Sequence, residues 1–164
     1  MEGRKYHAVN FLCAALLLLG SAAQSAELAI DGLVEFDLIG VYQVEAVTPE
    51  GFAQEQYQIT IDGTSRVYTV SVSNNMSRQG VRGYYSQALD SIPLIHHYEL
   101  IFTTSLGPAP SGFIFKKPEG YLVEYMKDLK GGLGVFIKTE TDGEDYLTAV
   151  HEALDILSRF RPGE

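Results

Sequence analysis

The sequence predicts an α+β fold: a single domain in which two amphipathic helices cover one antiparallel sheet, in the order strands, helix, four-strand meander, helix. Three observations lead to this prediction. Apolar and polar residues alternate in several short segments, as in half-buried strands. Two longer segments repeat apolar residues with a helical period. Short links containing Gly or Pro separate the later strand segments, which favours antiparallel neighbours.

The first strand segments precede the first helix. Alternation is clear in VYQVEAV, and YQITIDGTSRVYTVSV contains two alternating runs on either side of Asp62-Gly63. An Asp-Gly pair between two such runs predicts a β-hairpin. Segment 28–38 is either another strand or a mobile arm. After the first helix, the meander is predicted from HYELIFTT, GFIFK, YLVEYMK and LGVFIKT.

Two segments have helical periodicity. The first helix is predicted over about 78–91, with Pro93 as its end because proline disrupts a helix interior. The second is predicted over about 144–160, with Phe160 as the last residue of its apolar stripe and Pro162 just beyond.

The N-terminal segment has the features of a secretory signal peptide. Arg4 and Lys5 precede the uncharged run Phe11–Leu19, and small residues follow up to Ala26. The run is shorter than the ~20 apolar residues of a spanning helix, so no membrane span is predicted. We therefore expect a signal peptide over 1–26, an N-terminal strand or arm over 27–40, and a single α+β domain over 41–164.

Cleavage after residue 26 would remove Cys13, the only cysteine of the chain. The remaining 138 of the 164 residues would form no disulfide and offer no thiol chemistry. Small extracellular domains commonly use disulfides, so a cysteine-free exported domain favours a bacterial periplasm. We predict a periplasmic protein whose stability depends on its core.

Acidic residues dominate the charge. The formal net charge is −9, and the expected signal peptide contributes +1, which leaves about −10 on the mature chain. Nucleic acid and anionic membrane surfaces repel such a chain, so neither is expected as a partner. Segment 27–62 has eight acids and no base. This indicates either a solvated face or a region that docks on a cationic partner or on the arginines of the chain itself.

Several stretches together resemble a known family. The turn TPEGF follows an early strand, YTVSVS precedes the first helix, GYLVEYM and GVFIKT belong to the meander, and the last helix ends in ILSRFR. This layout, from about Tyr42 to Pro162, resembles the PsbP-like domains and their bacterial periplasmic relatives. In that family the early turn has the pattern Pro-x-Gly-Trp, and Phe52 stands here in place of the tryptophan. The resemblance implies a non-enzymatic accessory role and no particular functional residues.

Arg78 and Arg82 are basic residues in a position where helices favour acidic ones. They lie one turn apart at the expected start of a helix, where the helix dipole favours acids over bases. Gly80 and Gly83 beside them would let a ligand approach the backbone. The two arginines are therefore our candidate site for a carboxylate or phosphate. The alternative is that the helix begins nearer Val81 and the arginines pair with acids of the chain itself.

Other clusters lack the pattern of a catalytic or metal site. His96 and His97 are expected to open a strand, where adjacent side chains point to opposite faces and do not share one metal ion. His151 and Asp155 lie one turn apart in HEALD, a near match to a zinc-protease motif in which aspartate replaces the second histidine. With Glu144, they form the one cluster that an enzyme would use. We predict no catalytic residue, no metal and no cofactor.

The sequence thus predicts an exported, soluble, non-catalytic accessory or interaction protein of the bacterial cell envelope, with another envelope protein as its partner. An alternative is a periplasmic carrier of a small apolar or anionic ligand, because the mature chain has nine tyrosines and seven phenylalanines that could line a cavity. The same aromatic residues would equally serve as the core. An enzyme is the third possibility.

Overall fold

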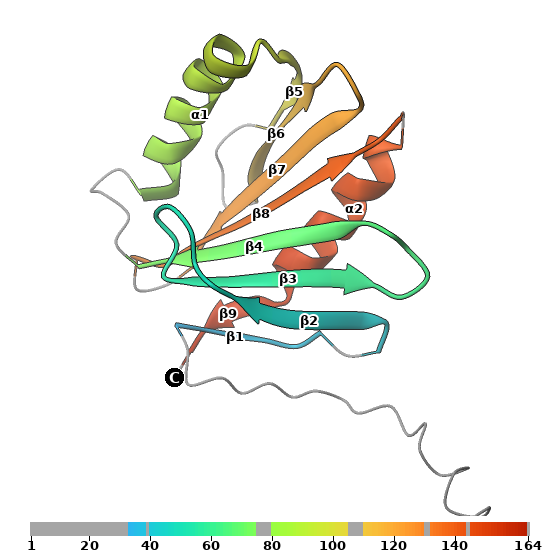
Figure 1. Ribbon diagram of the computed structural model, residues 1–164. Helices are drawn as coiled ribbons and strands as arrows, with labels where there is room; N and C mark the ends of the chain where they lie inside the picture. The colour runs from blue at the N-terminus through green and yellow to red at the C-terminus, as the bar shows by residue number, and fades with distance from the viewer. Residues whose placement is uncertain are drawn as a thin grey trace, which may run out of the picture.

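The computed structural model describes residues 33–163, except 39, 75–79, 105–109, 130–131 and 144 (Figure 1). The expected signal peptide lies outside the described residues. Within the described part of the chain, no helix has both the length and the apolar character that crossing a membrane requires.

The main sheet has seven strands, and every neighbouring pair is antiparallel. The strands are β2 (Tyr42–Val47), β3 (Glu55–Ile61), β4 (Val67–Ser73), β5 (Glu99–Thr103), β6 (Ser111–Lys116), β7 (Tyr121–Asp128) and β8 (Gly134–Thr141). Their order is β2-β3-β4-β8-β7-β6-β5. The pairing of β4 with β8 joins the first half of the chain to the second.

The β3–β4 hairpin turns at Asp62-Gly63, which confirms that prediction. Gly63 has φ +80°, a left-handed conformation that glycine adopts without a steric penalty. The N–H and the hydroxyl of Thr64 both donate to the carbonyl of Ile61 at 3.0 Å. These bonds stabilise the turn that joins the two strands.

Two helices accompany the antiparallel sheet, so the predicted α+β class is confirmed: α1 spans Gly80–His96 and α2 spans Tyr146–Ser158. The prediction that α1 ends before Pro93 is wrong, because Pro93 lies inside the helix. The helix ends instead at His97, whose φ of 57° leaves the helical region and whose N–H donates to the Pro93 carbonyl at 3.0 Å. His96 and His97 therefore end a helix and do not open a strand.

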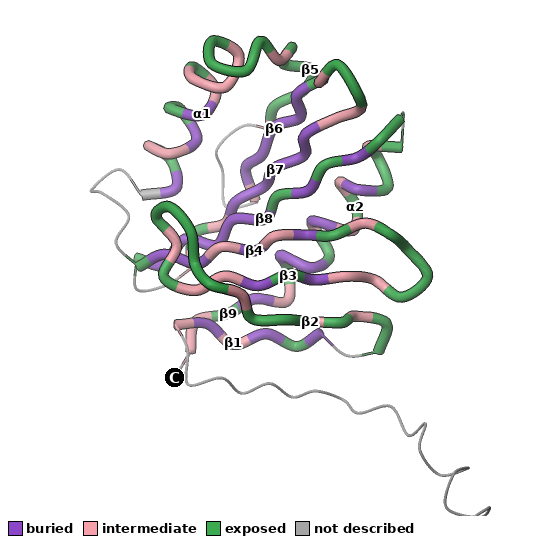
Figure 2. Tube along the Cα trace, in the orientation of Figure 1, coloured by how far each residue is buried: buried purple, intermediate pink, exposed green. Residues whose placement is uncertain are grey.

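The helices pack on opposite faces of the sheet, and the strands supply side chains to both cores (Figures 1 and 2). In β7, Val123 and Tyr125 belong to the core under α2, whereas Leu122 and Met126 belong to the core under α1. This explains why β7 is buried on both sides along most of its length. The α2 core is the larger one and includes residues of β3, β4, β7 and β8.

A second, two-stranded antiparallel sheet pairs β1 (Val34–Phe36) with β9 (Phe160–Pro162). The rings of Phe36 and Phe160 lie 4.9 Å apart between centroids, and both side chains are buried. The prediction that the second helix reaches Phe160 is wrong, since Phe160 pairs with Phe36 as the first residue of β9. Next to this pair, the N–H of Gly163 donates to the carbonyl of Leu33 at 3.1 Å.

Candidate functional site

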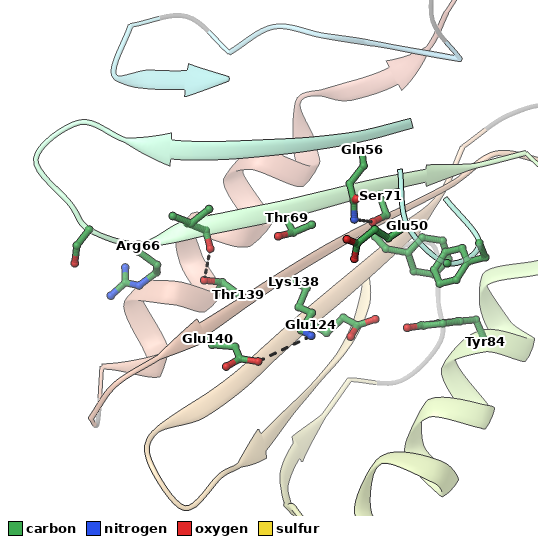
Figure 3. A pocket seen from close by; sticks show the side chains of 15 residues that line it. Glu50, Gln56, Arg66, Thr69, Ser71, Tyr84, Glu124, Lys138, Thr139 and Glu140 are labelled. Carbon is green, nitrogen blue, oxygen red and sulfur yellow. Dashed lines mark hydrogen bonds and ion pairs between the residues drawn. The ribbon is translucent and has the colours of Figure 1, made fainter. Parts of the chain in front are cut away.

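A groove of about 700 Å³ lies on the sheet face opposite α2. α1 covers part of this face, over β5, β6 and β7, and reaches Phe136 of β8. It leaves β3, β4 and the rest of β8 open beside it. Side chains from these strands, from β7, from α1 and from the loop between β2 and β3 line the groove (Figure 3). They include Glu50, Phe52, Gln56, Arg66, Thr69, Ser71, Tyr84, Glu124, Phe136, Lys138 and Glu140.

Strand register places polar side chains in rows across the floor of the groove. Thr69 of β4 pairs with Lys138 of β8, and Lys138 pairs with Glu124 of β7. In the next row, Gln56 of β3 pairs with Ser71 of β4, and the Gln56 amide donates to the Ser71 hydroxyl at 3.2 Å. Paired residues project to the same face of a sheet, so these five side chains share one surface.

Three aromatic rings form the wall of the groove next to α1. Phe52, from the loop between β2 and β3, lies 5.1 Å from Tyr84 of α1 and 5.0 Å from Phe136 of β8, measured between ring centroids. Tyr84 and Phe136 lie 4.8 Å apart. Such edge-on and tilted contacts are favourable aromatic geometry. Phe52 remains half-exposed, so the wall offers an apolar surface to a ligand.

Glu124 has the most unusual environment in the groove. Among the described residues it is the only charged one that is buried, with 5% of its surface exposed. Burial raises the pKa of its carboxyl group to about 7, against the opposing effects of a hydrogen bond from Tyr84 and the charge of Lys138. Burial and the Glu124 carboxylate in turn raise the pKa of the Tyr84 hydroxyl, which points toward Glu124 in Figure 3. The groove therefore contains a carboxyl group that changes protonation near neutral pH.

Lys138 extends above the floor of the groove with half of its side chain exposed. Its Nζ lies 3.9 Å from Oε1 of Glu140, which is also paired with Lys117. The hydrogen bond from Lys117 is the main cause that lowers the pKa of Glu140. Because Lys117 already compensates Glu140, the Lys138 ammonium can bind a ligand without leaving a carboxylate unpaired.

Arg66 lies at the far end of the groove, where it links β4 to α2. It forms a salt bridge with Glu152, and its Nη2 lies 3.4 Å from a carboxylate oxygen of Asp145. The Tyr68 hydroxyl donates to the same Glu152 carboxylate. The glutamate of the HEALD stretch thus holds the helix to the sheet, and Arg66 is already paired.

The predicted anion site is not part of this groove as far as the described residues show. Arg82 is exposed on α1 and is absent from the groove lining. Arg78 lies outside the described residues. A site formed by both arginines therefore stays a prediction.

The HEALD stretch lies on α2, on the other side of the sheet. His151 is exposed, and Asp155 accepts hydrogen bonds from the Tyr42 hydroxyl and from Arg159. Glu144, the third member of the cluster, lies outside the described residues. Across residues whose placement is described, no group of three His, Cys, Asp or Glu side chains could hold a metal ion.

Sequence reasoning missed Glu124, although the sequence contains a signal for it. In YLVEYMK, Leu122 and Met126 flank Glu124 on one face of the strand, and Val123 and Tyr125 occupy the other. A strand that is apolar on both faces is buried on both faces, so a lone acid within it is enclosed. That pattern predicts a buried carboxyl group, but not the groove beside it.

Comparison of the chain with models of known protein families finds no matching family, and comparison with curated proteins finds no match.

Proposed function

We propose that this protein is a non-catalytic binding protein, exported to the bacterial periplasm, and that the groove holds one small ligand. The observation that carries the proposal is the buried carboxyl group of Glu124 in the lining of a groove of about 700 Å³. Burial of an ionisable group costs free energy, and such groups concentrate at binding and catalytic sites.

The lining favours a ligand with a short apolar body and a head group that accepts hydrogen bonds. Phe52, Tyr84 and Phe136 supply the apolar wall. Lys138 and the protonated form of Glu124 supply donors on adjacent strands. A small carboxylate with an aromatic or short aliphatic body fits these groups.

The hydroxyl groups of the groove support binding over catalysis. The Ser71 hydroxyl accepts from the Gln56 amide, and the Thr139 hydroxyl donates to the Val67 carbonyl at 2.8 Å. No histidine is among the described residues that line the groove. A serine or threonine nucleophile needs an adjacent base, and the hydrogen bonds of these two hydroxyls go to an amide and to a carbonyl instead.

A second candidate is the accessory or interaction role that the resemblance to PsbP-like domains implies. It is favoured by the exposed edge strand β5, in which Leu100, Ile101 and Phe102 are each exposed by more than two-fifths. The two roles are compatible, because β5 and the groove occupy different parts of the sheet.

Native mass spectrometry of the protein purified from its own periplasm tests the proposed ligand. We expect an additional mass that is present under native conditions and lost under denaturing ones. Lys138→Met removes an exposed ammonium from the groove and should reduce the bound fraction at least several-fold.

Lys116→Met is the matched control, since Lys116 is exposed on β6 and does not line the groove. It should retain the ligand. A bare wild-type mass under native conditions, or equal occupancy in Lys138→Met and Lys116→Met, would rule out the groove as the site.

A further inference from the structure

Glu124 lies where the apolar core under α1 meets the groove. Along β7 its neighbours on this face of the sheet are Leu122 and Met126, and across the sheet it pairs with Phe113 of β6 and Lys138 of β8. Leu122, Met126 and Phe113 all belong to the buried core under α1. Such apolar neighbours favour the neutral form of a carboxyl group. A ligand therefore reaches this carboxyl group from the groove that it lines.

Two polar groups act directly on the Glu124 carboxyl group. The Tyr84 hydroxyl of α1 donates a hydrogen bond to it, and the charge of Lys138 favours its ionised form. Within the part of the chain that the structure describes, no ion pair includes Glu124. The Nζ of Lys138 lies instead 3.9 Å from Oε1 of Glu140. When ionised, Glu124 is therefore a buried carboxylate without a paired cation, which is an unfavourable state.

The other charged groups of the groove do not fix the charge of Glu124. Glu140 of β8 and Glu50, from the loop between β2 and β3, line the groove but are exposed, so solvent screens their charges. Arg66 of β4 lies at the far end, where Glu152 of α2 compensates it. A charged ligand beside the Glu124 carboxyl group therefore decides whether this group holds a proton.

We propose that a carboxylate ligand binds in the groove together with one proton from the solvent, which Glu124 takes up so that its neutral carboxyl group donates a hydrogen bond to the ligand. This inference rests on the proposed ligand class and adds the control of binding by pH. The ionised protein, the ligand anion and one proton give a complex in which two carboxyl groups hold that proton. Lys138, on the adjacent strand, compensates the remaining negative charge. Two carboxylates at hydrogen-bond distance in a buried site do not both stay ionised, so ligand and proton favour each other's binding.

The pKa of Glu124 in the free protein sets the pH range of this coupling. Burial raises that pKa to about 7, so the free protein holds the proton at pH 6 and has lost most of it at pH 8. At pH 8 the ligand must bring the proton with it, and this requirement weakens binding. The affinity for a carboxylate should therefore fall about tenfold from pH 6 to pH 8.

Isothermal titration calorimetry of the full exported chain tests the coupling, with phenylacetate and butyrate as probes. Both carboxylates are ionised at pH 6 and at pH 8, so their own titration does not contribute. We expect about tenfold weaker binding at pH 8 than at pH 6. We also expect an uptake of close to one proton per ligand at pH 8, obtained from the binding enthalpies in buffers of different ionisation enthalpy. The proton uptake is measured on the wild type alone, so it does not depend on how a variant folds.

Two variants assign the proton to Glu124. Glu124→Gln carries a neutral group of the same shape at every pH, and its affinity should change less than twofold between pH 6 and pH 8. Glu140→Gln is the matched control, because Glu140 also lines the groove but its pKa is lowered by the hydrogen bond from Lys117. This variant should keep the tenfold change, whatever its affinity at pH 6.

The possible failures are distinguishable. Equal wild-type affinities at pH 6 and pH 8, or a tenfold change that persists in Glu124→Gln, would refute the coupling and leave the proposed binding role intact. If neither probe binds at either pH, the proposed ligand class is wrong, and the coupling is refuted with it.

Discussion

At the scale of single residues, the carboxyl group of Glu124 affects both the proposed ligand binding and the stability of the fold. The folded protein holds the proton of this carboxyl group more tightly than the unfolded chain does, because burial raises its pKa from 4.5 to about 7. The stability contributed by the protonated form is therefore complete below pH 4.5. It is lost as the pH rises to about 7, and it stays lost above that value.

Glu124→Gln imitates the protonated carboxyl group at every pH. We expect the variant and the wild type to be similarly stable near pH 4.5, and the variant to be more stable above pH 7 by an amount on the order of 3 kcal/mol. Urea unfolding of both proteins across this range measures the difference. Glu119→Gln, at an exposed turn, is the control and should show no such trend. A constant difference between Glu124→Gln and the wild type would contradict the assignment.

At the scale of elements, sequence patterns predicted those helices and strands that form through interactions between residues close in the chain. Alternation of apolar and polar residues around Asp62-Gly63 predicted the β3–β4 hairpin, and helical periodicity predicted both helices. The end of α1 was misplaced because a proline weakens a helix but does not always end it. Here Leu89 and Ile92 pack against the core on the sheet and stabilise the turns around Pro93. The packing of these two side chains outweighs the tendency of proline to end a helix. The sequence around Pro93 does not show this packing.

Pro93→Ala tests this balance. Proline inside a helix lacks the N–H that would bond to the preceding turn, which costs about 3 kcal/mol in an ordinary helix interior. We expect alanine to raise the free energy of unfolding by about 1–2 kcal/mol, measured by chemical denaturation. Ser91→Ala in the same helix should change it by less than about 0.5 kcal/mol. A less stable Pro93→Ala would show that the ring itself has a packing role.

At the scale of the whole molecule, the groove depends on pairings that join distant parts of the chain. Its floor combines β3, β4, β7 and β8, and its wall adds a loop and α1. Glu124 and Lys138 lie in separate strands, and the sequence does not show which residue of β7 pairs with which residue of β8. Without the register, no pattern places the ammonium beside the carboxyl group. The same limitation applies to Phe160, whose partner Phe36 lies near the other end of the described chain.

Phe160→Ala tests how much the β1–β9 sheet contributes to the free energy of unfolding of the protein. The Phe160 ring is buried and packs on Phe36, so its removal leaves a cavity between the small sheet and the main one. We expect a loss of about 3–5 kcal/mol in the free energy of unfolding, measured by thermal or urea denaturation. Leu147→Ala, on the exposed side of α2, should cost less than about 1 kcal/mol.

The hydrogen bond between Gly163 and Leu33 places the two ends of the described chain beside each other. These two residues could therefore be joined without moving either strand of the small sheet. A short linker between these two residues, with new ends in the exposed loop Asp62–Ser65, would give a circularly permuted chain with the same strand neighbours.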